Sequence, residues 1–265
     1  MALLEVENLT VLSPRRREPF RNSLPEDPVA LLDSVSFAIP PGQTLGIVGE
    51  EDGGTLPLAF ALSGLSPISS GRIVFQDQEL NSLRERQRQV IRRQMPILFS
   101  DGFESLPPKT TVSRLLIAAH ANGGGSKDKA ERLREIERAM DRAGLAFSTR
   151  EKTRDSLTAA ERQRVSLTRA LLQHPRLLIL HEFTRGLDPA AQAELVNHLT
   201  DLQQDLGLAY LALTGDLALA AHLAPELLVV SRGKVVDAGP RDEIITNPQH
   251  EFTKRLLQIS ATSHV

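Results

Sequence analysis

Two glycines, Gly49 and Gly54, frame an acidic turn that follows a short apolar run and precedes a helical pattern. The apolar run covers residues 44–49, and the helical pattern covers residues 56–65. A strand, a glycine-bearing turn and a helix in this order place backbone N–H groups at a helix N-terminus, where an anion is favoured. The chemistry that these residues offer is therefore phosphate binding.

The elements expected around this turn alternate between strands and helices. Short apolar runs indicate strands, and apolar residues spaced three or four apart indicate helices. The alternation predicts an α/β fold with a largely parallel sheet. Residues 79–170 are instead predominantly helical in pattern, with a glycine-rich break at 121–126, and predict a helical lobe inserted into the core. The expected strands are 3–11, 29–39, 44–49, 71–75, 176–180, 209–213, 226–231 and 234–238, and the expected helices are 56–65, 128–142, 159–173, 190–206 and 217–223.

The composition excludes several classes of protein. The chain has 265 residues, 31 Lys and Arg, 33 Asp and Glu, and a formal net charge of −2, so nothing electrostatic indicates a nucleic-acid partner. The absence of cysteine excludes disulfides, thiolate metal sites and a cysteine nucleophile. No window approaches the ~18 continuous apolar residues of a membrane span, and Glu5 and Glu7 stand where a signal peptide carries bases. We therefore expect a cytoplasmic protein that reaches a membrane only through a partner.

A series of short segments resembles, in order and spacing, the ATP-binding subunits of ABC transporters, and the resemblance covers nearly the whole chain. The tail is most similar to that of the oligopeptide, dipeptide, nickel and Sap importers, and residues 250–257 most resemble the F subunit of Sap peptide transporters. Each segment alone is a weak signal, whereas their order is specific. The segments are 46–54 (Walker A loop), 99–112 (Q-loop and following residues), 157–165 with 169–172 (signature), 177–182 (Walker B strand), 184–188 (D-loop) and 247–257 (tail).

The resemblance implies a P-loop NTPase-like core sheet with an N-terminal antiparallel β subdomain and an inserted helical lobe. One ABC ATPase-like domain would cover residues 1–265, with its core at 1–85 and 166–245, the lobe at about 86–165 and a helical tail at 246–265. ATP and Mg²⁺ are the expected cofactors. The expected partners are membrane permease subunits, a paralogous ATPase in a head-to-tail heterodimer and, indirectly, a periplasmic substrate-binding protein. The expected location is the inner face of the cytoplasmic membrane.

The chain departs from the family in the Walker A loop, which in the family requires a lysine and a hydroxyl after its last glycine. Gly49, Gly53 and Gly54 keep the turn, but Thr55 replaces the lysine and Leu56 replaces the Mg²⁺-binding hydroxyl. One charge-assisted hydrogen bond is typically worth about 1.5–3 kcal/mol, so we expect nucleotide binding to be weak or absent. The acids of the turn either face water or occupy the place of a phosphate at the helix N-terminus.

The other nucleotide-handling positions are also changed. Ser100 replaces the Q-loop glutamine, His181 the Walker B aspartate and Gly215 the switch histidine. Glu182 aligns with the catalytic base, but with these groups replaced it has little to act on, and it is otherwise a structural acid at a strand end. His181 is either a packed histidine or a metal ligand, and we expect no metal there because no second ligand accompanies it. Asp188 matches the D-loop aspartate.

The signature segment is altered less. Thr158 keeps a hydroxyl, Ala159 and Ala160 replace glycines, and Glu161 replaces glutamine. Alanine retains a backbone N–H, although its Cβ limits close approach to a phosphate. In the family, the signature of one subunit closes the nucleotide site of the other. Two interpretations stay open: the segment still faces a partner's nucleotide, or it serves only helix packing.

We therefore expect a degenerate ATP-binding-type subunit of an ABC peptide importer, acting as a structural or regulatory partner of an intact paralogue. One alternative is an active ATPase subunit that hydrolyses ATP to drive peptide uptake. A second alternative is a regulatory binding module outside transport, because a fold alone does not establish a function.

Overall fold

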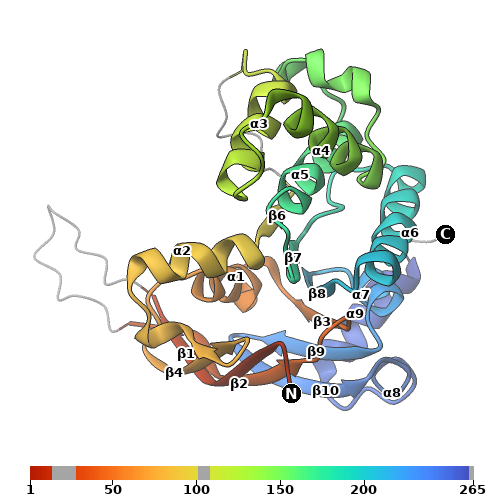
Figure 1. Ribbon diagram of the computed structural model, residues 1–265. Helices are drawn as coiled ribbons and strands as arrows, with labels where there is room; N and C mark the ends of the chain where they lie inside the picture. The colour runs from red at the N-terminus through yellow and green to blue at the C-terminus, as the bar shows by residue number, and fades with distance from the viewer. Residues whose placement is uncertain (14–27, 101–107, 263–265) are drawn as a thin grey trace, which may run out of the picture. The chain divides into compact units, whose positions relative to one another are not determined.

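The computed structural model describes residues 1–13, 28–100 and 108–262, and its elements are labelled in Figure 1. Contacts divide the chain into two compact units. Unit 1 comprises Met1–Pro40, Thr44–Arg84 and Leu213–Val265, and unit 2 comprises Pro41–Gln43 and Glu85–Ala212. The lobe predicted at 86–165 falls inside unit 2, and the predicted boundaries of core and tail stay a prediction.

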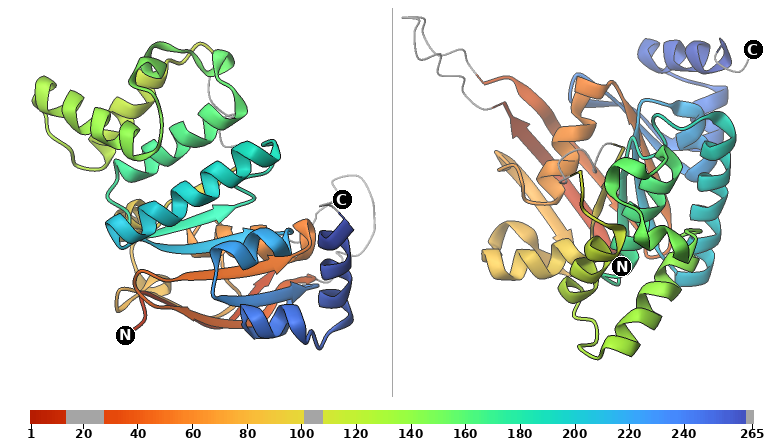
Figure 2. Two further views of the ribbon diagram at one scale, coloured as in Figure 1. Left: turned by 90° about the vertical axis from the view of Figure 1, so that its right-hand side faces the viewer. Right: turned by 90° about the horizontal axis from the view of Figure 1, so that it is seen from above.

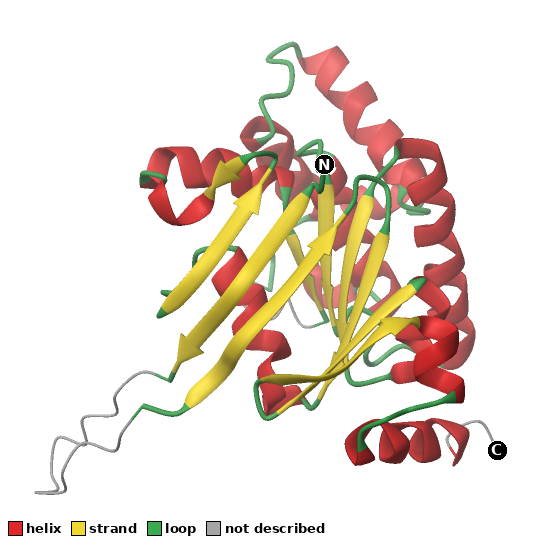
Figure 3. Cartoon of the chain, turned by 90° about the horizontal axis from the view of Figure 1, so that it is seen from below, coloured by secondary structure: helices red, strands yellow, loops and turns green. Residues whose placement is uncertain are grey.

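An antiparallel sheet forms the first part of unit 1, and among the described residues it has the strand order β2-β1-β4-β5. Val6 in the central strand β1 pairs with Phe37 on one side and Ile73 on the other. Figure 3 shows the strands of this sheet side by side. The antiparallel subdomain expected from the family resemblance is thus confirmed. The strands are β1 (Leu4–Leu12), β2 (Ala30–Ile39), β4 (Ser70–Phe75) and β5 (Gln78–Glu79), followed by the 3₁₀ turn η2 (Leu80–Ser82).

The second part of unit 1 surrounds strand β3 (Thr44–Gly49), whose residues are all buried. β3 runs parallel to β9, with Ile47 opposite Leu228, and β10 pairs antiparallel to β9. A strand with helices packed on both faces is apolar throughout, which explains the continuous run in the sequence. The helix α7 and the tail helix α9 pack onto this core, with Val48, Leu217 and Phe252 in one buried cluster (Figure 2). The elements are η1 (Glu51–Thr55), α1 (Leu56–Leu62), α7 (Leu217–Leu223), β9 (Glu226–Ser231), β10 (Lys234–Pro240), α8 (Arg241–Thr246) and α9 (Glu251–Thr262).

Unit 2 is built around helix α5 (Ala159–Leu171). One core cluster joins α5 to the strands β7 and β8 and to α6, and it includes Leu167, Leu178 and Leu199. A second cluster joins α5 to α3 and α4. The parallel pair β6 and β7 places Ile97 opposite Ile179. The remaining elements are α2 (Glu85–Gln94), β6 (Ile97–Phe99), α3 (Val112–Asn122), α4 (Lys129–Arg142), η3 (Phe147–Glu151), η4 (Arg154–Ser156), β7 (Leu177–His181), α6 (Pro189–Leu206) and β8 (Ala209–Thr214), which runs on into unit 1.

Side-chain caps set the helix boundaries that the sequence predicts. Asp128 caps α4 and Asp188 caps α6, each by accepting the backbone N–H three residues later. Gly207 ends α6 in the left-handed region at φ 63°, where glycine avoids the Cβ penalty. The expected α/β class is confirmed. The strand β6 is a difference, because it lies in a stretch for which the sequence pattern predicts mainly helix.

Candidate nucleotide-binding site

The predicted strand–turn–helix is present: β3 ends at Gly49, the turn η1 follows, and α1 begins at Leu56. Gly54 adopts φ 120°, a conformation that side chains disfavour. A Cβ on Gly54 would lie 2.9 Å from Cδ2 of Leu32, and a Cβ on Gly49 would lie 2.8 Å from the carbonyl oxygen of Val230. The close approach of β2 and β9 therefore requires both glycines, and the loop scaffold is retained.

The side chain at the position predicted for the lysine is buried. Thr55 is 1% exposed, and among the described residues its Oγ1 has no hydrogen-bond partner. An ideal Cβ on Gly49 would lie 3.5 Å from Cγ2 of Thr55, so the two residues pack together. The N–H of Gly53 donates to the carbonyl oxygen of Glu50 at 2.7 Å, which closes the turn on itself. The loop thus has a buried, uncharged side chain where a phosphate-binding loop has a positive charge.

Ser100 and His181 lie at the ends of the adjacent strands β6 and β7. The carbonyl oxygen of Ser100 accepts a 2.9 Å hydrogen bond from Nε2 of Gln163 on α5. His181 is 7% exposed and pairs with Phe99 across the two strands. The two rings meet edge to face, with centroids 5.5 Å apart. This geometry favours the interpretation of His181 as a packed histidine, and the described residues contain no group of three His, Cys, Asp or Glu that would hold a metal ion.

Glu182 follows β7 with φ 47°, in the left-handed region that non-glycine residues seldom adopt. Its carbonyl oxygen accepts the N–H of Arg185 at 2.9 Å in a tight turn. Backbone strain of this kind is characteristic of functional sites, although it assigns no reaction. Asp188, further along, accepts the N–H of Ala191 at 3.0 Å and caps α6. Asp188, predicted to be the D-loop aspartate, thus has a structural role as the N-cap of α6.

The signature segment forms a capping box at the start of α5. Oγ1 of Thr158 accepts the N–H of Glu161 at 3.2 Å, and the Glu161 carboxylate accepts the N–H of Thr158 at 3.0 Å. Lys152 Nζ donates to the same carboxylate at 2.7 Å. Burial raises the pKa of Glu161, but the hydrogen bonds from Lys152 and Thr158 outweigh it, so the pKa lies below its ordinary value. Thr158 and Ala159 are exposed and Ala160 is partly buried, so the start of the helix is accessible.

Gly215 lies between β8 and α7 in unit 1 and brings no side chain to the position of the switch histidine. Its neighbour Asp216 caps α7 by accepting the N–H of Leu219 at 3.0 Å. The predicted site residues are therefore divided: the Walker A loop and Gly215 belong to unit 1. Ser100, the signature segment, His181, Glu182 and Asp188 belong to unit 2.

These residues do not fit a Mg²⁺-bound nucleotide. The cradle of backbone groups is kept, but a buried threonine at position 55 supplies no charge for a phosphate. Leu56 and His181 occupy the positions where the sequence resemblance predicts oxygen ligands, and Mg²⁺ prefers oxygen. At these predicted positions the described residues supply neither a cation for a phosphate nor an oxygen ligand for a metal.

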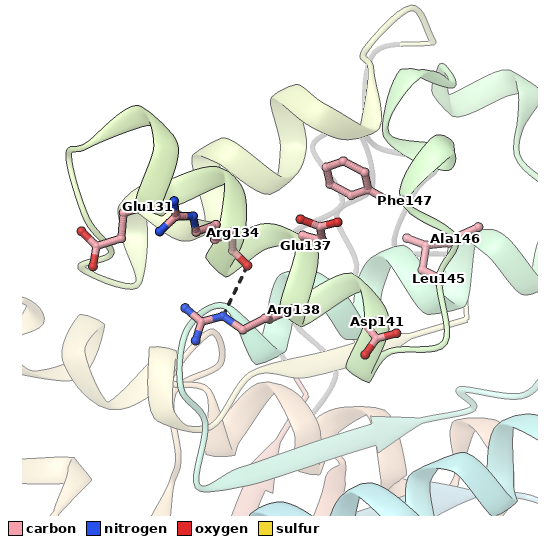
Figure 4. A pocket seen from close by; sticks show the side chains of 8 residues that line it. All are labelled: Glu131, Arg134, Glu137, Arg138, Asp141, Leu145, Ala146 and Phe147. Carbon is pink, nitrogen blue, oxygen red and sulfur yellow. Dashed lines mark hydrogen bonds between the residues drawn. The ribbon is translucent and has the colours of Figure 1, made fainter.

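A hollow on α4 contains no residue that the sequence predicted for a site (Figure 4). It has a volume of about 740 Å³, with Phe147 on one side and charged residues of α4 on the other. Arg138 Nε donates to the carbonyl oxygen of Arg134 at 3.4 Å. The only signal in the sequence is the charged face of the helix, which is typical of a solvated surface. The charged residues are Glu131, Arg134, Glu137, Arg138 and Asp141.

The sequence matches a known family and several curated relatives. The family described as "ABC transporter" matches residues 32–185. Peptidoglycan transport ATP-binding protein YejF of Agrobacterium fabrum is 36% identical over 231 residues, covering 87% of this chain and 42% of the relative. Glutathione import ATP-binding protein GsiA of Shigella boydii is 32% identical over 257 residues, covering 96% and 40%. A putative peptide import ATP-binding protein of Brucella ovis is 32% identical over 227 residues, covering 86% and 71%. The chain thus spans less than half the length of the first two relatives.

Solved structures share the fold. A dimeric ATP-binding cassette in a post-hydrolysis state bound to ADP and Pi aligns with TM-score 0.77 and 19% identity, covering 90% of this chain and 98% of its own. CbiO1 from Clostridium perfringens, part of the ABC transporter complex CbiONQ, aligns with TM-score 0.78 and 22% identity, covering 100% and 99%. These similarities confirm the P-loop NTPase-like fold. None of the described helices has the length and apolar character needed to cross a membrane.

Proposed function

Because the chain belongs to the ABC transporter family of ATP-binding proteins, we propose that it is a degenerate subunit of a peptide importer. In this role it contributes structure or regulation rather than ATP hydrolysis. The observation that carries the proposal is Thr55, a buried and uncharged residue at the position where a phosphate-binding loop needs a cation. The retained glycines and the side-chain caps of α5 and α6 support the proposal that the fold is kept although the chain does not hydrolyse ATP.

The proposed partners are membrane permease subunits and an intact paralogous ATPase, paired with this chain head to tail. The relatives named for import of glutathione and for putative peptide import support peptides as the transported class. The chain would lie at the inner face of the cytoplasmic membrane through the permease and would act with a periplasmic substrate-binding protein only indirectly. The exposed start of α5 supports a contact with the paralogue's nucleotide.

The test uses the assembled transporter, with ATP hydrolysis and peptide uptake measured in vesicles. We expect Glu182→Gln in this chain to leave both rates unchanged, because the chain's own site does not hydrolyse ATP. The matched Glu→Gln change in the paralogue is the control, and it should abolish both rates. A several-fold loss of hydrolysis with Glu182→Gln would support the active ATPase instead. Failure of this chain to co-purify with any permease would support the regulatory module.

A further inference from the structure

A second cavity in unit 2 lies between strand β6 and one face of helix α5. It has a volume of about 200 Å³. Ser166 and Arg169 line it from α5, Gln173 lines it from the turn just after α5, and residues 96–99 line it from the other side. Because Ser166 and Arg169 are three residues apart, they share one face of the helix.

Arg169 is a partly buried cation that has no counter-charge among the described residues. Among the residues that the structure describes, none forms an ion pair or a hydrogen bond with its guanidinium group. Burial lowers the pKa of Arg169, and no carboxylate in the described part of the chain opposes the effect. A buried charge is costly unless it is paired, so this side chain favours an anion in the cavity.

The surrounding groups suit a small oxyanion. An arginine fork binds carboxylate and phosphate oxygens through two parallel N–H bonds. Ser166 is 8% exposed, and its hydroxyl adds a donor one helical turn away. The amide of Gln173 donates to the carbonyl oxygen of Arg169 at 3.2 Å, which fixes the end of the helix beside the cavity.

We propose that this cavity binds a small oxyanion, either inorganic phosphate or a small carboxylate, with Arg169 as its principal ligand. A water molecule takes about 30 Å³ of liquid, so 200 Å³ holds an oxyanion with a few waters. The cavity is smaller than the roughly 300–1,000 Å³ of typical cofactor sites, so it excludes a nucleotide. The site is distinct from the Walker A loop and does not depend on the proposed transport role.

The experiment is thermal unfolding of the full chain at constant pH and ionic strength, with chloride replaced by phosphate in one series and by acetate in another. Ligand that binds only the folded state raises the midpoint, by about 2–4 °C at tenfold excess over Kd. We expect the rise in at least one series, and the series that gives it identifies the anion. Arg169→Met should remove the rise, whereas Arg162→Met, on an exposed residue of the same helix, should keep it.

If Arg169→Met does not fold, titration calorimetry with the same anion on the unmodified chain and on Arg169→Lys tests the site instead. Arg169→Lys preserves the charge without the fork, and we expect its affinity to fall about tenfold. No rise with either anion, or a rise that survives Arg169→Met, would overturn the site.

Discussion

The side chain of Gln163 donates a 2.9 Å hydrogen bond from Nε2 to the carbonyl oxygen of Ser100. Gln163 lies on α5, where the sequence predicts the signature segment, and Ser100 is the residue predicted at the position of the Q-loop glutamine. The bond uses the backbone of Ser100, so it does not require a glutamine there. The link between α5 and the end of β6 is therefore independent of the side chain at position 100. The proposed degenerate subunit would keep this contact without a glutamine at that position.

Restoring the two Walker A side chains should increase nucleotide affinity. In Thr55→Lys with Leu56→Ser, the lysine supplies one charge-assisted bond of about 1.5–3 kcal/mol, so Kd for Mg-ATP should fall about 10- to 100-fold. The measurement is fluorescence titration with a labelled nucleotide. Leu65→Lys, on a side chain that is 64% exposed, is the control for added charge. An equal gain with Leu65→Lys would show that the effect is not local to the loop.

Glu161→Gln should change how stability depends on pH. The pKa of folded Glu161 lies below its ordinary value, so its stabilisation is present above the unfolded pKa and is lost as pH falls through the folded pKa. Glutamine still accepts the Thr158 N–H but loses the attraction of Lys152. Urea unfolding from pH 7 to pH 3 should therefore show a shallower loss of stability for the variant. An unchanged slope would contradict the Lys152 contact.

The C-terminal helix should depend on a buried carboxylate. Asp237 is 8% exposed; it accepts the N–H of His250 at 3.0 Å and also a short hydrogen bond from Thr253 Oγ1. Asp237→Ala should destabilise unit 1 by about 1.5–3 kcal/mol and speed proteolysis of α9. Asp242→Ala, which removes an exposed ion pair with Arg241, should cost under about 1 kcal/mol. Equal effects of the two changes would show that the buried contacts do not anchor the tail.

The glycine-rich break after α3 should not tolerate a larger residue at Gly123. A Cβ on Gly123 would lie 2.2 Å from the carbonyl oxygen of Leu172, whereas nothing lies within 4 Å of a Cβ on Gly124. Gly123→Ala should cost about 2–4 kcal/mol in denaturant unfolding because backbone must move. Gly124→Ala carries only the penalty of its φ of 80°, about 1–2 kcal/mol. A reversed order would contradict the packing of this turn.

Much of the fold follows from the sequence because the spacing of hydrophobic residues and the capping residues indicate the same helices and strands. The runs at residues 44–49 and 177–181 are buried strands, and the charged pattern at 128–142 is α4 with its predicted N-terminal boundary. The strand β6 was missed because three residues give no alternation to detect, and only its parallel pairing with β7 makes it a strand.

The sequence predicted which residues would form the candidate site, but not how buried they are or which side chains they contact. The sequence identifies Thr55 and His181 as substitutions, but it does not show that Thr55 is buried or that His181 meets Phe99. Both facts depend on contacts between elements. The sequence predicts a break at 121–126 from its glycines alone, and the structure adds that Gly123 and Gly125 allow close approach to Leu172 and His120. Tertiary contacts decide such points, and local patterns do not contain them.

The most direct test of the central claim is calorimetric titration of the purified chain with Mg-ATP, alone and mixed with a candidate paralogue. The account predicts no measurable heat from the chain alone, because the loop at Gly49 to Leu56 lacks its cation and metal-binding hydroxyl. The mixture should bind with one nucleotide per heterodimer at the paralogue's loop. Micromolar binding by the chain alone would contradict the degenerate site.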